Sequence, residues 1–336
     1  MISNKISTFF YYHNWRYRFF VDGKADKRQF FQVYDNSPHP PIYLNRCIVI
    51  LSGKAHLWAF DTHGGFADRL KGIISIYKSC KDLKKEFKIF HTYPYKLESF
   101  LIPNQIDWTI NSNEVVYNVN AVKPFYFRHS PYLKDEIEYS KWRLNKILKR
   151  EKQCIHLYSN ICSVTDDDFS LLFNELFKPS QALQREIDNH IIALDNSYIS
   201  LSFRFTHLLG DPIDEYMEVL PDSEKKELMI KAFKSIEHFH YLYPNNKLLI
   251  NSDSNSFLSY VKERAKDYVY IVPGIPVHID QTDKASDSSY LKTFIDFFLI
   301  GKAQKVYLIK EKRMRNSGFP KCAAIVWNKP FEVYHI

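Results

Sequence analysis

Arg204 is the side chain of this sequence best placed to bind a charged ligand. It closes an alternating segment over residues 198–205, in which Ile199, Leu201 and Phe203 alternate with polar residues as in a half-buried strand. Open α/β sheets bind ligands beyond the carboxyl ends of their strands, and a planar guanidinium matches a phosphate or diphosphate. The alternative is an edge-strand arginine paired with a surface carboxylate, and this segment alone does not separate the two.

A second basic segment supplies further candidates for an anion site. Arg315, Ser317, Gly318 and Phe319 follow a predicted strand and lead into a short apolar helix. Free backbone N–H groups at a helix start, together with cations, form a nest for a diphosphate. The alternative is a solvated basic loop, whose charge Glu311 partly offsets.

Gly64 and Gly65 directly precede a predicted helix, with His63 before them and Arg69 after them. A helix N-terminus offers free amide donors to a phosphate, so the pair is a candidate cradle. The spacing fits neither the dinucleotide-binding nor the ATP-binding glycine motif. The alternative is a tight turn that places Asp68 favourably for the helix dipole.

Two acidic segments are candidates for ligand or metal binding. Asp253 follows a predicted strand, where its carboxylate could hold a nucleobase or ribose hydroxyls; the alternative is a helix-capping cluster. Asp166, Asp167 and Asp168 could hold a divalent metal, but they follow Thr165 at a predicted helix start, where acidic residues are expected anyway. We therefore expect no metal site.

Composition and charge limit the classes of protein and partner. The 336 residues carry a net charge of +8, with 38 acidic residues mixed among 46 basic ones. This balance favours an anionic small ligand, and we expect no nucleic-acid partner. Five scattered cysteines without C-x-x-C spacing indicate reduced thiols. With no signal peptide and no apolar run that could span a bilayer, we expect a cytoplasmic protein, which could contact the inner face of a membrane peripherally.

Two segments bear on membrane contact. Residues 1–45 are rich in aromatic side chains interleaved with Arg16 and Arg18, and we expect them to wrap onto the main body; a membrane-associating arm is the alternative. The basic run over residues 141–152 is interpreted as a charged helix face rather than as an acceptor or lipid site.

Alternating strand and helix patterns predict an α/β protein with two Rossmann-like domains facing a central cleft. The first unit has predicted strands at 47–51, 55–60 and 87–91 and a helix after Gly65, and we assign it residues 1–185. The second unit, residues 186–336, alternates more cleanly. Its predicted strands and helices cover residues 198–205, 224–243, 247–251, 257–264, 268–272, 288–300 and 305–309.

Several of these segments, taken in order, resemble the fucosyltransferase superfamily of inverting glycosyltransferases, which includes the alpha-1,6, alpha-1,2 and protein O-fucosyltransferases and the rhizobial nodulation enzyme. The segment from Gly64 to Arg69 resembles the family's N-terminal glycine-rich segment, and Ser202-Phe-Arg204 resembles its H-x-R-x-x-D motif. Asn251-Ser-Asp253 resembles the segment that contacts the guanine base, and Ser317-Gly318-Phe319 its serine-bearing turn. Ser202 stands where the family has histidine, Asp211 lies beyond the expected aspartate, and Ala67-Asp68 replaces Gly-Asn.

The resemblance implies a GT-B-like fold, with an N-terminal acceptor-side domain and a C-terminal domain that binds the nucleotide sugar. It implies metal-independent, inverting transfer, most directly of fucose from GDP-fucose, to a glycan or lipid-linked oligosaccharide in surface polysaccharide synthesis in a bacterium; another GDP- or UDP-sugar is the alternative donor. Arg204 would neutralise the leaving diphosphate with help from Arg315, Ser317 and Gly318.

The acceptor-activating base would be Asp211, Glu215 or His63. Two other functions remain open: a non-catalytic nucleotide- or carbohydrate-binding protein on the same fold, and a phosphate-binding α/β hydrolase.

Overall fold

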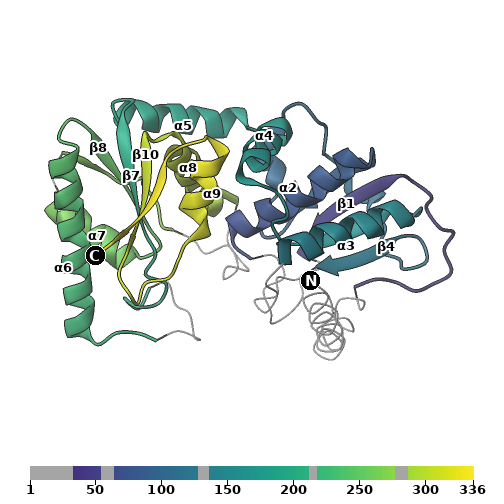
Figure 1. Ribbon diagram of the computed structural model, residues 1–336, viewed down its shortest axis with the longest axis horizontal. Helices are drawn as coiled ribbons and strands as arrows, with labels where there is room; N and C mark the ends of the chain where they lie inside the picture. Colours follow the sequence, from purple (N-terminus) through teal and green to yellow (C-terminus); the bar gives the residue numbers. More distant parts are fainter. Residues whose placement is uncertain (1–32, 54–63, 128–135, 212–217, 266, 277–286) are drawn as a thin grey trace, which may run out of the picture.

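The computed structural model describes residues 33–53, 64–127, 136–211, 218–265, 267–276 and 287–336. Its strands form two parallel sheets, each covered by helices, and a small antiparallel pair (Figure 1). The predicted α/β class with two Rossmann-like units is therefore confirmed. Among these described ranges, no helix combines the length and apolar character needed to cross a bilayer.

The N-terminal sheet has the strand order β2-β1-β5-β4, and every neighbouring pair is parallel. Helices α2 and α3 pack against its face formed by Cys47, Val49, Ile155 and Leu157. The bounds are Arg46–Leu51 for β1, Phe66–Asp82 for α2, Glu86–His91 for β2, Lys123–Phe127 for β4, Glu136–Arg150 for α3 and Ile155–Ser159 for β5.

The C-terminal sheet is also parallel and has the order β11-β10-β7-β8-β9. Helices α6 and α7 pack on one face, while α5, α8 and α9 pack on the other, toward the N-terminal sheet. The bounds are Gln181–Ala193 for α5, Tyr198–Phe203 for β7, Asp222–Leu242 for α6, Lys247–Ser252 for β8, Asn255–Arg264 for α7, Val269–Tyr270 for β9, Asp287–Lys302 for α8, Lys305–Lys310 for β10, Gly318–Val326 for α9 and Phe331–His335 for β11.

A short connection joins the two sheets. Helix α4, Asp166–Leu176, leads into β6, Phe177–Pro179, which pairs antiparallel with β3, Leu101–Pro103. Single 3-10 turns cover Leu97–Ser99 and Ser112–Glu114. The domain boundary predicted at residue 185 falls inside α5, a helix that packs against α8 of the C-terminal unit.

One apolar core joins the two units. It combines buried residues of β1, α2 and α4 with buried residues of α5, α8 and α9. In Figure 1, α8 and α9 accordingly lie between the two sheets. The helices α2 and α9, which each follow the carboxyl end of a strand, therefore begin in the same region of the molecule.

Most predicted elements are confirmed within a few residues, and the differences concentrate in short strands. Strands β4 and β11 were not predicted, and β9 covers two residues where five were expected. A further strand predicted at residues 55–60 lies outside the described residues, as does most of the 1–45 segment. Of the latter, Tyr34 is described and buried, whereas residues 35–41 and 43–45 are exposed, so the expected packing on the main body is seen at Tyr34 alone among the fully buried described residues. All five cysteines are free thiols, four of them buried.

Candidate nucleotide-sugar site

Arg204 and Asp253 form an ion pair at the carboxyl ends of two adjacent strands. In the β7–β8 register Phe203 lies beside Ser252, so the residue after each strand meets its neighbour. An Nη atom of Arg204 lies 3.2 Å from a carboxylate oxygen of Asp253. Strand β7 is the central strand of the sheet, so the edge-strand interpretation of Arg204 is wrong, although the expected carboxylate partner exists.

Asp253 also holds the turn that follows Arg204. Its two carboxylate oxygens accept hydrogen bonds from the backbone N–H of Phe205 at 2.9 Å and of Thr206 at 2.8 Å. Thr206 has a φ of 60°, a left-handed conformation that is costly for a β-branched residue. Burial raises the pKa of Asp253, while the Arg204 guanidinium and the two amides oppose that shift. Asp253 therefore positions Arg204 and its turn, and its predicted contact with a base or ribose stays a prediction.

Three buried polar atoms, each within two residues of Arg204 or Asp253 along the chain, have no hydrogen-bond partner in the described part of the protein. They are the hydroxyl oxygens of Ser202 and Thr206 and the side-chain carbonyl oxygen of Asn251. Ser202 and Asn251 are register partners, and Ser202 shares a sheet face with Arg204 two residues later. Buried polar atoms are nearly always hydrogen-bonded in folded proteins, so these three remain able to bond to a ligand or to water.

Asp211 lies at the start of α7. Its carboxylate accepts hydrogen bonds from the Ser254 hydroxyl at 2.7 Å and from the Ser256 N–H at 2.9 Å. Ser254 is the N-cap of that helix and accepts from the Phe257 N–H. Asp211 thus links the loop after β7 to the start of α7. Its carboxylate, a candidate base, accepts both of these hydrogen bonds in the structure.

The predicted glycine turn opens α2 as expected. Gly64 has a φ of 64°, Gly65 is the N-cap, and Asp68 lies in the first turn with its carboxylate beside Gly64, as the helix-dipole alternative expects. Arg69 is only 1% exposed, and it donates to the carbonyl oxygens of Gly64 at 3.0 Å and Tyr93 at 2.8 Å. The Arg69 guanidinium therefore holds the glycine turn in place through its hydrogen bond to the Gly64 carbonyl oxygen.

The start of α9 meets the start of α2. Ser317 is the N-cap of α9 and makes no capping hydrogen bond, and the first turn carries no acidic residue. Lys71 of α2 reaches across, since a Cβ built on Gly318 would lie 3.3 Å from its ammonium nitrogen. Phe319 packs on Phe66, with ring centroids 6.2 Å apart. The structure thus brings together the two helix starts that the sequence singled out separately.

Lys71 was not predicted as a site residue. Its ammonium forms an ion pair with Asp68 at 2.8 Å and lies at the junction of the two helix starts. The signal was its position in α2 one helical turn after Asp68, which alone is indistinguishable from an ordinary surface lysine.

Arg315, His63 and Glu215 are the remaining candidate site residues. Arg315 is exposed and forms no ion pair with any residue that the structure describes, so its cation is available. His63 and Glu215 lie outside the described residues. Arg204 with Asp253, and the paired starts of α2 and α9, lie beyond the carboxyl ends of strands, and no hydrogen bond or ion pair among the described residues joins these two clusters directly.

The acidic segment predicted to begin a helix does so. Asp166, Asp167 and Asp168 form the first turn of α4, and the Thr165 hydroxyl accepts from the Asp168 N–H at 3.2 Å. No group of three or more His, Cys, Asp or Glu side chains suited to a metal ion occurs among the residues with described positions.

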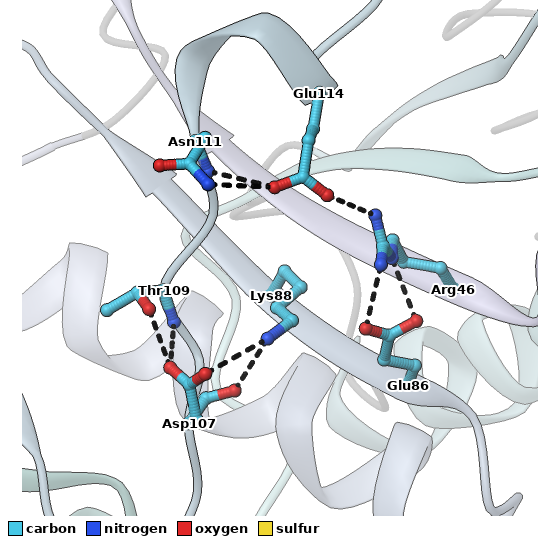
Figure 2. Close-up of polar contacts among 7 residues, drawn as sticks. All are labelled: Arg46, Glu86, Lys88, Asp107, Thr109, Asn111 and Glu114. Carbon is cyan, nitrogen blue, oxygen red and sulfur yellow. Dashed lines mark hydrogen bonds and ion pairs between the residues drawn. The ribbon is translucent and has the colours of Figure 1, made fainter.

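A polar groove of about 380 Å³ lies along the outer edge of the N-terminal sheet, where none of the predicted site residues lines it. Figure 2 shows that five of its charged side chains pair with one another. Arg46 pairs with Glu86 at 2.8 Å and with Glu114 at 3.2 Å, and Lys88 lies 3.6 Å from Asp107. Arg46 and Glu86 begin their strands, so the groove lies away from the carboxyl ends where the candidate residues gather.

No family model matches the sequence, and no curated protein matches it. Solved structures do match. The NodZ alpha-1,6-fucosyltransferase soaked with GDP-fucose superimposes with a TM-score of 0.53 at 14% identity, over 84% of this chain and 92% of that one. A structure of fucosyltransferase NodZ from Bradyrhizobium gives 0.53 at 13% identity, over 83% and 91%.

A plant enzyme extends the comparison. A mutant of Arabidopsis thaliana FUT1 in complex with GDP superimposes with a TM-score of 0.52 at 8% identity, over 93% of this chain and 75% of that one. Identities this low establish shared architecture, and the alignments span both sheets. The chain therefore has the two-domain GT-B fold seen in solved fucosyltransferases.

Proposed function

We propose that this protein is a metal-independent, inverting glycosyltransferase that moves a sugar from a nucleotide-sugar donor, with GDP-fucose as the first candidate, to a glycan or lipid-linked oligosaccharide. The observation that carries the proposal is Arg204. It follows the central strand of the C-terminal sheet, is held by Asp253, and adjoins three buried polar atoms that lack partners in the described chain. Similar folds have been solved with GDP and GDP-fucose.

Several positive groups support transfer without a metal ion. Arg204 keeps further guanidinium donors beyond the one that meets Asp253, and its side chain is 28% exposed. The starts of α2 and α9 meet and carry the partial positive charge of their helix dipoles, which the Asp68 carboxylate partly offsets at α2. A diphosphate leaving group gains negative charge as its bond to the sugar breaks, and fixed donors of this kind stabilise that charge.

In the proposed step, an acceptor hydroxyl oxygen attacks the anomeric carbon from the face opposite the nucleotide. The new glycosidic bond forms as the bond from that carbon to the diphosphate oxygen breaks, which inverts the configuration. The hydroxyl proton passes to a base, and the nucleoside diphosphate leaves with the bonding electron pair. Asp211, Glu215 and His63 remain the candidates for this base.

The donor nucleotide is tested by thermal shift with GDP, UDP and CMP. A nucleotide present at about 100 times its Kd stabilises the native state by about 2.7 kcal/mol, a readily measured rise in Tm. We expect GDP to give the largest rise, and Arg204→Ala to abolish it. Arg185→Ala, an exposed arginine on α5, is the matched control and should keep the wild-type response. No Tm rise with any of the three nucleotides would contradict the proposal.

Turnover separates the transferase from the two alternatives. A transferase releases free nucleotide from the donor sugar in proportion to product when acceptor is present, and keeps this activity in EDTA. A non-catalytic binding protein shows the nucleotide-dependent rise in Tm without turnover. Release of sugar or phosphate in the absence of acceptor would favour the hydrolase instead.

A further inference from the structure

Helix α3 presents a basic face that carries an exposed tryptophan. Trp142, Lys146, Lys149 and Arg150 recur at i, i+4, i+7 and i+8, which places them along one side of a helix. The opposite side, with Leu144 and Leu148, is buried in the shared core. Trp142 is 53% exposed, and the Lys146 ammonium lies 4.6 Å from the centre of its ring.

Two carboxylates flank this face, Glu138 one turn before Trp142 and Glu151 directly after Arg150, and neither forms an ion pair with a residue that the structure describes. Between Glu138 and Glu151 the helix carries five basic residues and no acidic one. Of these, Lys141, Lys146, Lys149 and Arg150 form no ion pair with a carboxylate in the described ranges. The adjacent helix α2 behaves differently, because Lys71, Lys78 and Lys81 all pair with acidic side chains.

Two exposed apolar side chains in the segment before β1 lie near the connection from α3 to β5. Tyr43 is 70% exposed and Leu44 is 42% exposed. The Ile42 carbonyl accepts a hydrogen bond from the Cys154 N–H at 2.8 Å, which fixes the two residues beside the segment that follows α3. Arg150 lies roughly 12 Å along the helix axis from Trp142, at 1.5 Å per residue.

Carboxylates at the same edge of the sheet do not cancel the positive charge. Glu86 and Glu114 are there, but both are paired with Arg46 (Figure 2). The surface defined by Trp142, Lys146, Lys149 and Arg150, together with Tyr43 and Leu44, thus combines unneutralised cations with large exposed apolar groups.

We propose that this surface, the α3 face, docks on a bilayer that contains anionic phospholipid. Tryptophan and tyrosine favour the headgroup region, where an apolar ring and a polar edge are both satisfied. Lysine and arginine beside them are attracted by the negative surface potential. An acidic protein or a nucleic acid would neutralise the cations but would leave Trp142, Tyr43 and Leu44 without an apolar environment. The inference goes beyond the proposed transferase activity and does not depend on it.

Vesicle co-sedimentation of the full chain tests the proposal, with phosphatidylcholine vesicles compared with vesicles that also contain phosphatidylglycerol. We expect binding to the anionic vesicles only, weakening as salt is raised. The triple variant Lys146→Gln, Lys149→Gln, Arg150→Gln should reduce partitioning on the order of a hundredfold, because each basic residue near an anionic surface contributes several-fold. The matched control removes three exposed, unpaired lysines from α6 and should bind as wild type: Lys226→Gln, Lys231→Gln, Lys234→Gln.

Tryptophan emission provides a second readout that does not depend on the triple variant. Anionic vesicles should shift the emission of the wild-type protein to shorter wavelength, and Trp142→Phe should lose that shift while keeping the wild-type circular dichroism spectrum. Equal sedimentation of the triple variant and the wild type would overturn the proposal, as would an undiminished emission shift in Trp142→Phe. Binding to an oligonucleotide or an acidic peptide without vesicle binding would also overturn it, in favour of that partner.

Discussion

At the scale of single residues, Asp253 and Arg204 act as one unit. The aspartate satisfies two backbone amides and pairs with the guanidinium, so the turn with Thr206 in a left-handed conformation is held by a side chain from the neighbouring strand. Backbone strain of this kind persists only where the surrounding structure enforces it, and such strain clusters at functional sites. The orientation of Arg204 toward a diphosphate would then be established before any ligand binds.

Asp253→Asn should separate the positioning role from simple charge loss. One carboxylate oxygen becomes an NH₂ group that cannot accept a hydrogen bond, so we expect the free energy of unfolding to fall by about 1–2 kcal/mol. Urea denaturation measures this loss, and Asp267→Asn, at an exposed position, is the control. The nucleotide-induced Tm rise should fall as well. A variant that unfolds as wild type yet binds no nucleotide would instead show that Asp253 contacts the ligand directly.

At the scale of elements, the position of α2 over β5 depends on Gly72, a residue without a side chain. A Cβ built on Gly72 would lie 1.8 Å from the Ser159 carbonyl oxygen, a rigid backbone atom. At Gly318 the nearest atom is the end of the Lys71 side chain, 3.3 Å away, which can move. The two glycines therefore differ in kind, because the first permits close helix-to-strand packing and the second keeps a helix start open.

Alanine substitutions at these two glycines should differ strongly. Gly72→Ala forces α2 away from β5, and we expect it to cost about 3 kcal/mol or more. Gly318→Ala should change stability by less than about 1 kcal/mol, since Lys71 can turn aside. Chemical denaturation of both variants measures the difference. Comparable losses at the two positions would mean that α2 does not pack on β5 as closely as described.

Buried histidines in the N-terminal sheet make its stability depend on pH. Burial lowers the pKa of His156 to about 3, and burial together with the Arg69 guanidinium lowers that of His91 to about 3. The unfolded chain takes up these protons near pH 6.5 and the folded protein does not, so stability is full above pH 6.5 and falls as pH decreases toward 3. At pH 5 each of these histidines should lower the free energy of unfolding by about 2 kcal/mol relative to its value above pH 6.5.

Denaturation at pH 7 and pH 5 tests this linkage. We expect His156→Gln to lose less stability than the wild-type protein between these two pH values, by about 2 kcal/mol, because glutamine does not titrate. His39→Gln, at an exposed position, serves as the control. An unchanged pH dependence in His156→Gln would mean that this imidazole is accessible to protons in the folded protein.

At the scale of the whole molecule, the two domains share one core. Phe297 of α8 is fully buried, with its ring 4.9 Å from that of Phe66 in α2 and 6.0 Å from that of Phe173 in α4. The Val326 carbonyl at the end of α9 accepts hydrogen bonds from Ser170 and Asn174 of α4. Inter-domain contacts that are large and apolar restrict relative domain motion.

The shared core predicts cooperative unfolding of the whole chain. Phe297→Ala should cost about 3–5 kcal/mol and shift a single calorimetric transition to lower temperature. Phe257→Ala, in the core on the far side of the C-terminal sheet, should shift the same transition by a similar amount. Two resolved transitions, of which only one responds to Phe297→Ala, would show that the domains unfold independently.

The sequence by itself determined the architecture and the identity of the main anion-binding candidate. Strand alternation and helical periodicity are local signals set by which faces are apolar, and they were sufficient for most elements of both sheets. Arg204 could be singled out because its chemistry and its position at a strand end are both readable locally. The strands β4 and β11 were not predicted, because their pairing depends on neighbours far along the chain.

Only the tertiary structure decided how the candidate residues are used. Asp253 and Arg69 appeared as ligand-binding groups in the sequence, yet one also holds the turn after β7 and the other holds the glycine turn of α2. Lys71 was identified as a site residue only from the contact between the starts of α2 and α9. The α3 face was identified only from the ion pairs that the neighbouring charged side chains form. Hydrogen bonds and ion pairs join residues that are distant in sequence, so their partners are properties of the fold rather than of the local pattern.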